Sequence, residues 1–300
     1  MEDLIKKLGI LFIILAAIAM SSLIVAVFLS FAGNTSLTSG NVAVIPITGV
    51  IANAEDAWTD YAQPDTIVAW IDDANNDPTI KAIVFEINSP GGSPVASDEI
   101  AQAIMRANKT TVAYIRDMGA SGAYWIASST DHIIANRMSL TGSVGVTGSY
   151  IEWAGTLRRY NATYRQFKAG EYKEIGNPFA DASLEEQQVY QAKIDRLQEF
   201  FIQHVREERN LTTAQVKSIS TGEPFLGVEA LPLGLVDELG SKAELDAYLM
   251  QKLGEKPTYS YYEKPSTLIE QLGLVKSSAA PSMEQTIASE AAYSGAGLRT

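Results

Sequence analysis

The chain of 300 residues contains no cysteine, only two histidines, and fewer basic than acidic side chains. The missing cysteine excludes disulfides, thiol catalysis and cysteine-ligated metal sites. His132 and His204 form no metal-binding motif, and we expect both to be structural. The formal net charge of −12, without a sustained basic run, argues against nucleic acid as a partner.

A long apolar segment stands near the start of the chain. Residues 8–32 carry no charged side chain and would form a helix of about 37 Å, against a bilayer core of about 30 Å. The segment exceeds the apolar region of a cleaved signal peptide, about 7–15 residues, so we expect an uncleaved transmembrane anchor. Because Lys6 and Lys7 precede it, residues 1–7 should be cytoplasmic, and the chain after residue 32 should lie on the extracytoplasmic side of the cytoplasmic membrane.

The remaining sequence alternates apolar strand patterns with helical patterns. We expect a polar linker over 33–41, a folded domain over 42–254, and a polar, partly disordered tail over 255–300. The alternation predicts an α/β fold with parallel strands and right-handed crossovers. Strands are expected at 42–47, 80–87, 111–115, 133–135, 143–146 and 163–167, and helices at 65–74, 93–108, 124–128, 183–209 and 242–252.

The longest predicted helix has a defined start and one apolar face. Ser183 and Glu186 form a capping-box pattern at its beginning. An apolar stripe at helical spacing indicates packing in the core or at a subunit interface. The stripe consists of Tyr190, Ile194, Leu197, Phe201 and Val205.

A single serine stands among small residues in Gly119-Ala120-Ser121-Gly122-Ala123, between a strand pattern and a helix pattern. A serine at such a turn is uncrowded and close to backbone N–H groups, as a nucleophile requires. A turn that packs a helix tightly on a sheet would have the same composition. The stretch also departs from the G-x-S-x-G elbow of many hydrolases at its last position, Ala123.

Two glycines, Gly91 and Gly92, follow the preceding predicted strand. Because glycine has no Cβ, their N–H groups can approach a substrate carbonyl and form an oxyanion hole. An ordinary tight turn would use the same residues. Neighbouring parallel strands, however, bring this loop and the Ser121 turn to one edge of the sheet, which favours an acyl-transfer site.

The residues alone leave the general base open. A lysine activates a serine only when it is neutral, and desolvation must lower its pKa from about 10.4 to achieve this. Lys168 and Lys173 lie in a loop with aromatic and apolar neighbours and are equal candidates on this ground. Either could equally be a surface lysine.

Several motifs in order resemble the signal peptide peptidase A (SppA) family of membrane-anchored Ser-Lys peptidases. The resemblance implies a fold akin to Clp protease and crotonase, built from repeated β-β-α units. The matching stretches are 44–51, 88–92, 120–124, 141–146, 172–173 and 234–240.

The resemblance also implies a role for each candidate residue. Lys173 follows the Gly-x-Tyr step of the family, whereas Lys168 does not. The implied roles are nucleophile for Ser121, general base and acid for Lys173, orientation of Lys173 for Ser143, and oxyanion hole for Gly92 with Gly91 and Gly122.

The implied function is a membrane-anchored serine endopeptidase that hydrolyses remnant signal peptides and misfolded exported proteins. It needs no cofactor, and the resemblance implies a homo-oligomeric ring in which Lys173 can reach a neighbour's Ser121. A stomatin-associated Ser-Lys peptidase is the near alternative. Two further alternatives are a crotonase-type acyl-CoA enzyme and a non-catalytic membrane scaffold. The first would bind CoA esters, and the second would have no reason to support covalent labelling of Ser121.

Overall fold

The computed structural model describes residues 9, 20–22, 40–54 and 61–263. The anchor predicted over 8–32 therefore falls almost entirely outside the described residues, as do most of the linker and the tail from residue 264. Among the helices that the structure describes, none is both long and apolar enough to cross a membrane.

The described chain alternates strands and helices, as predicted. The strands are β1 (Val42–Thr48), β2 (Val50–Ile51), β3 (Tyr61–Ala62), β4 (Ala82–Ser89), β5 (Thr110–Ala120), β6 (His132–Ala135), β7 (Leu140–Gly142), β8 (Pro224–Leu226), β9 (Glu238–Leu239) and β10 (Tyr259–Tyr261). The helices are α2 (Pro64–Asn76), α3 (Pro94–Met105), α4 (Gly122–Ser128), α5 (Ala154–Arg159), α6 (Leu184–Glu208), α7 (Thr213–Ile219), α8 (Gly227–Ala230) and α9 (Lys242–Leu253).

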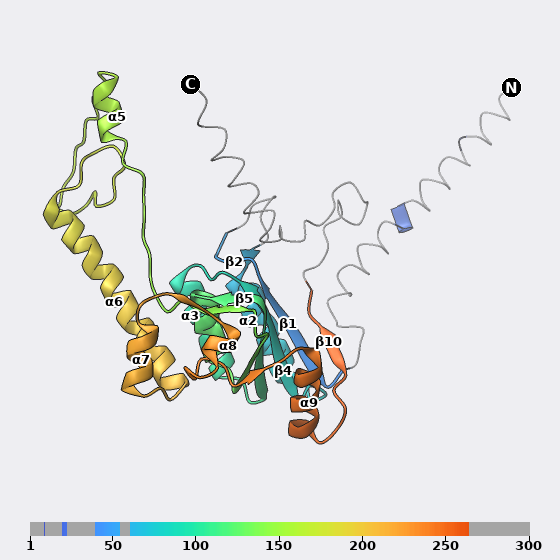
Figure 1. The fold of residues 1–300 in the computed structure, drawn as a ribbon. Coiled ribbons are helices and arrows are strands. Elements are labelled where there is room, and N and C mark those ends of the chain that lie inside the picture. Colours follow the sequence, from blue (N-terminus) through green and yellow to red (C-terminus); the bar gives the residue numbers. More distant parts are fainter. Residues whose placement is uncertain (1–8, 10–19, 23–39, 55–60, 264–300) are drawn as a thin grey trace, which may run out of the picture.

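A largely parallel sheet forms the centre of the fold (Figure 1). Its strands follow the order β10-β1-β4-β5-β6-β9. The long strand β5 pairs with β6 along its first half and with β7 along its last three residues. The strand β7 also pairs antiparallel with β8. The α/β prediction is confirmed, and the division of β5 between two partners positions the candidate site.

Both faces of the sheet are buried, which explains why its strands read as continuous apolar runs. In β1, Ala43 and Ile45 face the core formed with α2, α3 and α4. Their neighbours Val42 and Val44 face the opposite side, where Leu249 of α9 covers them. The period of two along the strand thus separates two apolar layers.

Two predicted strands are wrong. Residues 143–146 form no strand, because Ser143 has a φ of +52°, a left-handed backbone conformation that ends β7. Residues 163–167 also form none. Their alternating pattern has no neighbouring strand to pair with among the described residues, and Phe167 is 94% exposed.

Residues 147–200, here called the arm, extend away from the sheet (Figure 1). The arm comprises α5, the connection that follows it and the first part of α6, and Ala154 is its only buried residue. Ser183 caps α6 as predicted, since its Oγ accepts the N–H of Glu186 at 3.1 Å. Of the predicted apolar stripe, Phe201 and Val205 are buried. The part of the stripe on the arm is partly exposed, as at Tyr190, Ile194 and Leu197.

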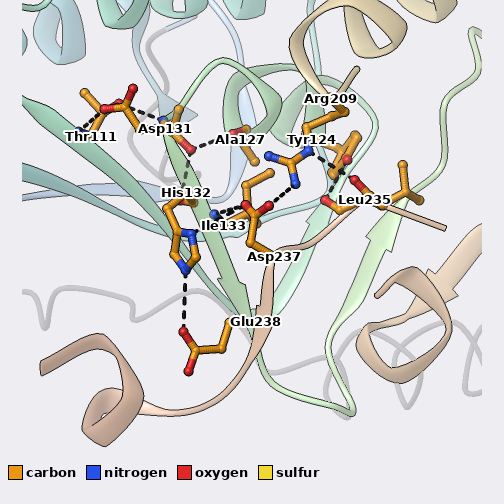
Figure 2. Close-up of polar contacts among 12 residues, drawn as sticks. Thr111, Tyr124, Ala127, Asp131, His132, Ile133, Arg209, Leu235, Asp237 and Glu238 are labelled. Carbon is orange, nitrogen blue, oxygen red and sulfur yellow. Dashed lines mark hydrogen bonds and ion pairs between the residues drawn. The ribbon is translucent and has the colours of Figure 1, made fainter. Parts of the chain in front are cut away.

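A polar cluster fixes the end of α6 to the sheet (Figure 2). The guanidinium of Arg209 donates to Asp237 Oδ1 at 2.6 Å and to the carbonyl of Gly234 at 3.2 Å. The other carboxylate oxygen of Asp237 accepts the N–H of Ile133 in β6 at 2.7 Å. Because the Arg209 side chain is only 8% exposed, its charge depends on this partner.

We predict that Asp237→Ala lowers the free energy of unfolding by about 3 kcal/mol, because it leaves the buried Arg209 charge without its carboxylate partner and the Ile133 N–H without its acceptor. Urea unfolding followed by circular dichroism measures the change. Glu238→Gln is the control: this neighbouring carboxylate is 41% exposed and lies 3.5 Å from His132, and its loss should change stability by less than about 0.5 kcal/mol. Equal effects of the two substitutions would contradict the prediction.

Candidate active site

The candidate residues follow the carboxyl ends of three neighbouring strands. Ser89 at the end of β4 is paired with Gly119 of β5, and Ala120 of β5 is paired with Gly142 of β7. The next residues of each chain segment therefore emerge side by side at one edge of the sheet. This is where α/β folds concentrate their sites.

Ser121 occupies a sharp turn between β5 and α4. Its φ of +53° is rare for a residue with a Cβ and costs on the order of 1–3 kcal/mol. The turn is held by its backbone, since the N–H donates to the carbonyl of Gly142 at 2.9 Å and the carbonyl accepts from Tyr124 and Trp125. Among the described residues, the Ser121 hydroxyl has no hydrogen-bond partner. The strained backbone thus presents a partly exposed Ser121 hydroxyl that no described residue engages, as a nucleophile would require.

The glycine loop after β4 lies directly against this turn. A Cβ added to Gly91 would lie 2.6 Å from the nitrogen of Gly122 and 3.0 Å from the Cβ of Ser121. A Cβ added to Gly122 would lie 3.2 Å from the nitrogen of Gly92. The sequence-based hypothesis that both loops meet at Ser121 therefore agrees with the structure.

The three predicted oxyanion glycines are not equivalent. The N–H of Gly91 already donates to the buried hydroxyl of Ser89 at 3.1 Å, so this group is not free for a substrate. The N–H groups of Gly92 and Gly122 have no partner among the described residues. These two donors next to Ser121 can hold a developing oxyanion. Gly91 contributes in another way: because it has no side chain, its loop can lie directly against the Ser121 turn.

Ser143 directly follows Gly142, the last residue of β7, and Gly142 is paired with Ala120, the residue before Ser121. Its backbone also has positive φ, and its hydroxyl donates to the carbonyl of Gly222 at 3.1 Å. The structure thus brings together Ser121, Ser143 and the glycine loops.

Lys173 is not brought to this edge within the chain. It belongs to the connection between α5 and α6, which is tied to α5 by the ion pair of Arg158 with Asp181 at 2.5 Å. Figure 1 shows α5 and the start of α6 at the end of the arm remote from the sheet. Lys173 is exposed, whereas Lys168 lies 3.7 Å from Glu186 and donates to a backbone carbonyl.

Both histidines pack against aromatic side chains, and these contacts give each of them a structural role that does not involve Ser121. His132 stacks on Tyr248 with ring centroids 3.9 Å apart, and His204 stacks on Trp125 at 4.4 Å. Burial lowers the pKa of His204, which favours its neutral form. Within the described part of the chain, neither ring forms a hydrogen bond or a stacking contact with Ser121.

Two buried serines that the sequence did not reveal support the site. Ser89 holds the N–H of Gly91, and Ser97 of α3 lies against Gly122, where an added Cβ would meet its Oγ at 2.4 Å. The Ser97 hydroxyl donates to the carbonyl of Ser93 at 2.9 Å. The sequence did contain a signal for Ser97: it is a polar residue on the buried face of α3, the face that Ile100 and Ala101 share.

We predict that Gly91→Ala abolishes covalent labelling of Ser121 by a serine-reactive phosphonate. The methyl group would collide with Gly122 and Ala120 and would sit on a backbone with φ +96°. Gly155→Ala in α5 is the control, because the nearest atom to its added Cβ is 3.8 Å away. Labelling that persists in Gly91→Ala at the control rate would contradict the assigned geometry.

Comparisons with known proteins agree with this site. Residues 103–256 match the model of Peptidase family S49. The chain is 30% identical to a candidate protease of Methanocaldococcus jannaschii over 78% of each chain. It is 34% identical to Protease 4 of Salmonella typhi, over 77% of this chain but only 38% of that protein. With a candidate signal peptide peptidase SppA of Enterococcus faecium, identity is 31% over 64% of this chain and 57% of that one.

Among solved structures, the chain is similar to a membrane-bound stomatin-specific protease, with a TM-score of 0.47 and 17% identity over 76% of this chain and 100% of that one. The family match covers half of the sequence and includes Ser121, Ser143 and Lys173. The chain therefore belongs to Peptidase family S49 and is a serine peptidase.

Proposed function

We propose that the protein is an endopeptidase of the cytoplasmic membrane that hydrolyses remnant signal peptides with Ser121 and Lys173. The observation that carries the proposal is the convergence of the N–H groups of Gly92 and Gly122 beside the Ser121 hydroxyl, since none of these three groups has a hydrogen-bond partner in the described part of the chain. A nucleophile and an oxyanion hole are the parts that acyl transfer requires besides a base.

In the proposed reaction, Ser121 Oγ attacks the peptide carbonyl while Lys173 Nζ takes the hydroxyl proton. The N–H groups of Gly92 and Gly122 stabilise the oxyanion. Lys173 then gives the proton to the leaving amine, and the C–N bond breaks to leave an ester on Ser121. Water, deprotonated by the same lysine, hydrolyses this ester and restores the serine. Ser143 orients the lysine.

We propose that Lys173 acts on the Ser121 of a neighbouring subunit in a homo-oligomeric ring. Two observations support this. The described chain offers no base to its own Ser121 hydroxyl, and the arm that carries Lys173 exposes large apolar side chains. Tyr160 is 77% exposed and Phe167 is 94% exposed, and such surfaces are typical of protein interfaces.

The proposed substrate follows from the resemblance and from the predicted anchor over residues 8–32. An anchored peptidase with its catalytic domain outside the cytoplasmic membrane would meet signal peptides that leave the translocation machinery. Residues 146–150 belong to no described strand, and an extended peptide could pair with their backbone.

We predict that Ser121→Ala and Lys173→Ala each reduce hydrolysis of a signal-peptide substrate by about 1,000-fold or more, because each removes a group that takes part in bond formation or proton transfer. Lys168→Ala is the matched control, and it should retain activity. Intact-mass analysis with a serine-acylating probe should detect one adduct, lost in the first two variants. An adduct that is lost in Ser121→Ala and kept in Lys173→Ala would show that the base is another group.

We further predict that Ser121→Ala and Lys173→Ala chains regain activity when co-expressed, because mixed neighbours then combine an intact serine with an intact lysine. Tandem purification through a different tag on each chain isolates the mixed assemblies. If these remain inactive while the wild type is active, the two residues do not act between subunits.

A further inference from the structure

The arm has a narrow connection to the body of the protein. Of the 25 residues of α6, all within the described chain, only Phe201 and Val205 are buried, and both lie in its last third. This end of α6 packs on α4. The direction in which the arm leaves the body is therefore set by a few side chains near the end of one helix.

The central contact is the stacking of His204 on Trp125. The rings lie 4.4 Å apart and within 5° of parallel. His204 Nε2 lies 3.2 Å from the carbonyl oxygen of Trp125, a distance at which a protonated Nε2 donates a hydrogen bond to it. Nε2 also lies 3.1 Å from the Ser129 hydroxyl. Phe201 packs against the Trp125 ring, with the two ring centroids 5.2 Å apart. We call Trp125, Ser129, Phe201 and His204 the joint.

The joint connects the arm to the helix that begins at the nucleophile. The N–H of Trp125 donates to the carbonyl of Ser121 at 3.0 Å, so the joint lies one helical turn from Ser121. A second attachment follows along the chain, where Arg209 pairs with Asp237. Two attachments along one helix define its axis, and the joint is the one nearer to the arm.

We infer that the joint is a positioning element of the peptidase: it fixes the angle of α6 and thereby the place at which the arm presents Lys173 to the neighbouring subunit. The inference rests on the proposed function. From His204 to the start of α6 the helix is about 30 Å long, so a tilt of about 5° moves its far end by about 3 Å. Misplacement of a catalytic group by about 1 Å can cost 10²-fold in rate.

The test separates the two roles of the chain by means of the co-expressed assembly of Ser121→Ala and Lys173→Ala chains. In such an assembly, one chain supplies the serine and the other supplies the arm with its lysine. We add His204→Ala either to the chain that supplies Lys173 or to the chain that supplies Ser121. Hydrolysis of a quenched fluorescent peptide of small and apolar residues measures the activity of each assembly.

We expect His204→Ala to lower kcat by about tenfold or more when it is in the Lys173-supplying chain, and by less than about twofold in the Ser121-supplying chain. A joint that only stabilises the turn at Ser121 would give the opposite pattern. That result, equal losses in both chains, or no loss in either would overturn the inference. Inactivity of the parent assembly without the His204 change would instead refute the action between subunits, and the joint's role with it.

Two further variants guard against general misfolding. His204→Phe keeps a ring against Trp125 and should restore most of the activity in the Lys173-supplying chain, whereas a general folding defect would not be rescued in this way. Gln203→Ala changes an exposed neighbour on the same helix and should have no effect. Native mass spectrometry compares assembly size. Loss of the assembly in His204→Ala would overturn the inference, because the joint would then determine association and not the position of Lys173.

Discussion

The contact on which the rest of the site depends is the close approach of two backbone turns, at Gly91 and at Ser121-Gly122. No side chain fits between them, since even a methyl group on Gly91 would lie 2.6 Å from the nitrogen of Gly122. The approach is possible because β4 and β5 are adjacent and parallel, so that both turns leave the sheet at the same edge. The buried hydroxyl of Ser89 then engages Gly91, and the N–H groups of Gly92 and Gly122 are left for a substrate.

Helix α4 connects this site to two other parts of the molecule. Tyr124 anchors it in the core, where its hydroxyl donates to the carbonyl of Leu235 at 2.7 Å and its burial raises the pKa of the phenol. Trp125, the next residue, packs against the end of α6 through its ring contacts with His204 and Phe201. One short helix therefore begins at the Ser121 turn, packs into the core on one side and contacts the arm's helix α6 on another. A rigid helix transmits position between these parts better than a loop would.

The arm is built differently from the body. In the body, both faces of the sheet are covered, and apolar side chains are buried in two layers. In the arm, Ala154 is the only buried residue, and local contacts such as the Arg158–Asp181 pair hold the connection between α5 and α6. Exposed ion pairs of this kind contribute little stability, and the apolar side chains of the arm gain nothing while they face water. Both facts are in line with our proposal that the arm contacts a neighbouring subunit.

The sequence by itself determined the parallel α/β body, the approximate positions of its main strands β1, β4, β5 and β6 and of helices α2, α3, α4 and α9, and the meeting of the glycine loop with the Ser121 turn. These depend on short-range patterns: apolar strand runs, the capping box at Ser183, and small residues that follow successive strands. Only the tertiary structure decided that residues 163–167 form no strand, that Gly91 donates its N–H to Ser89, and that Lys173 lies on an arm apart from its own Ser121. The reason is physical. A strand forms only beside a partner strand, and a hydrogen bond forms only where an acceptor is within reach. The direction of a long helix is set by the tertiary contacts at the end that packs on the body. None of these is a property of the local sequence.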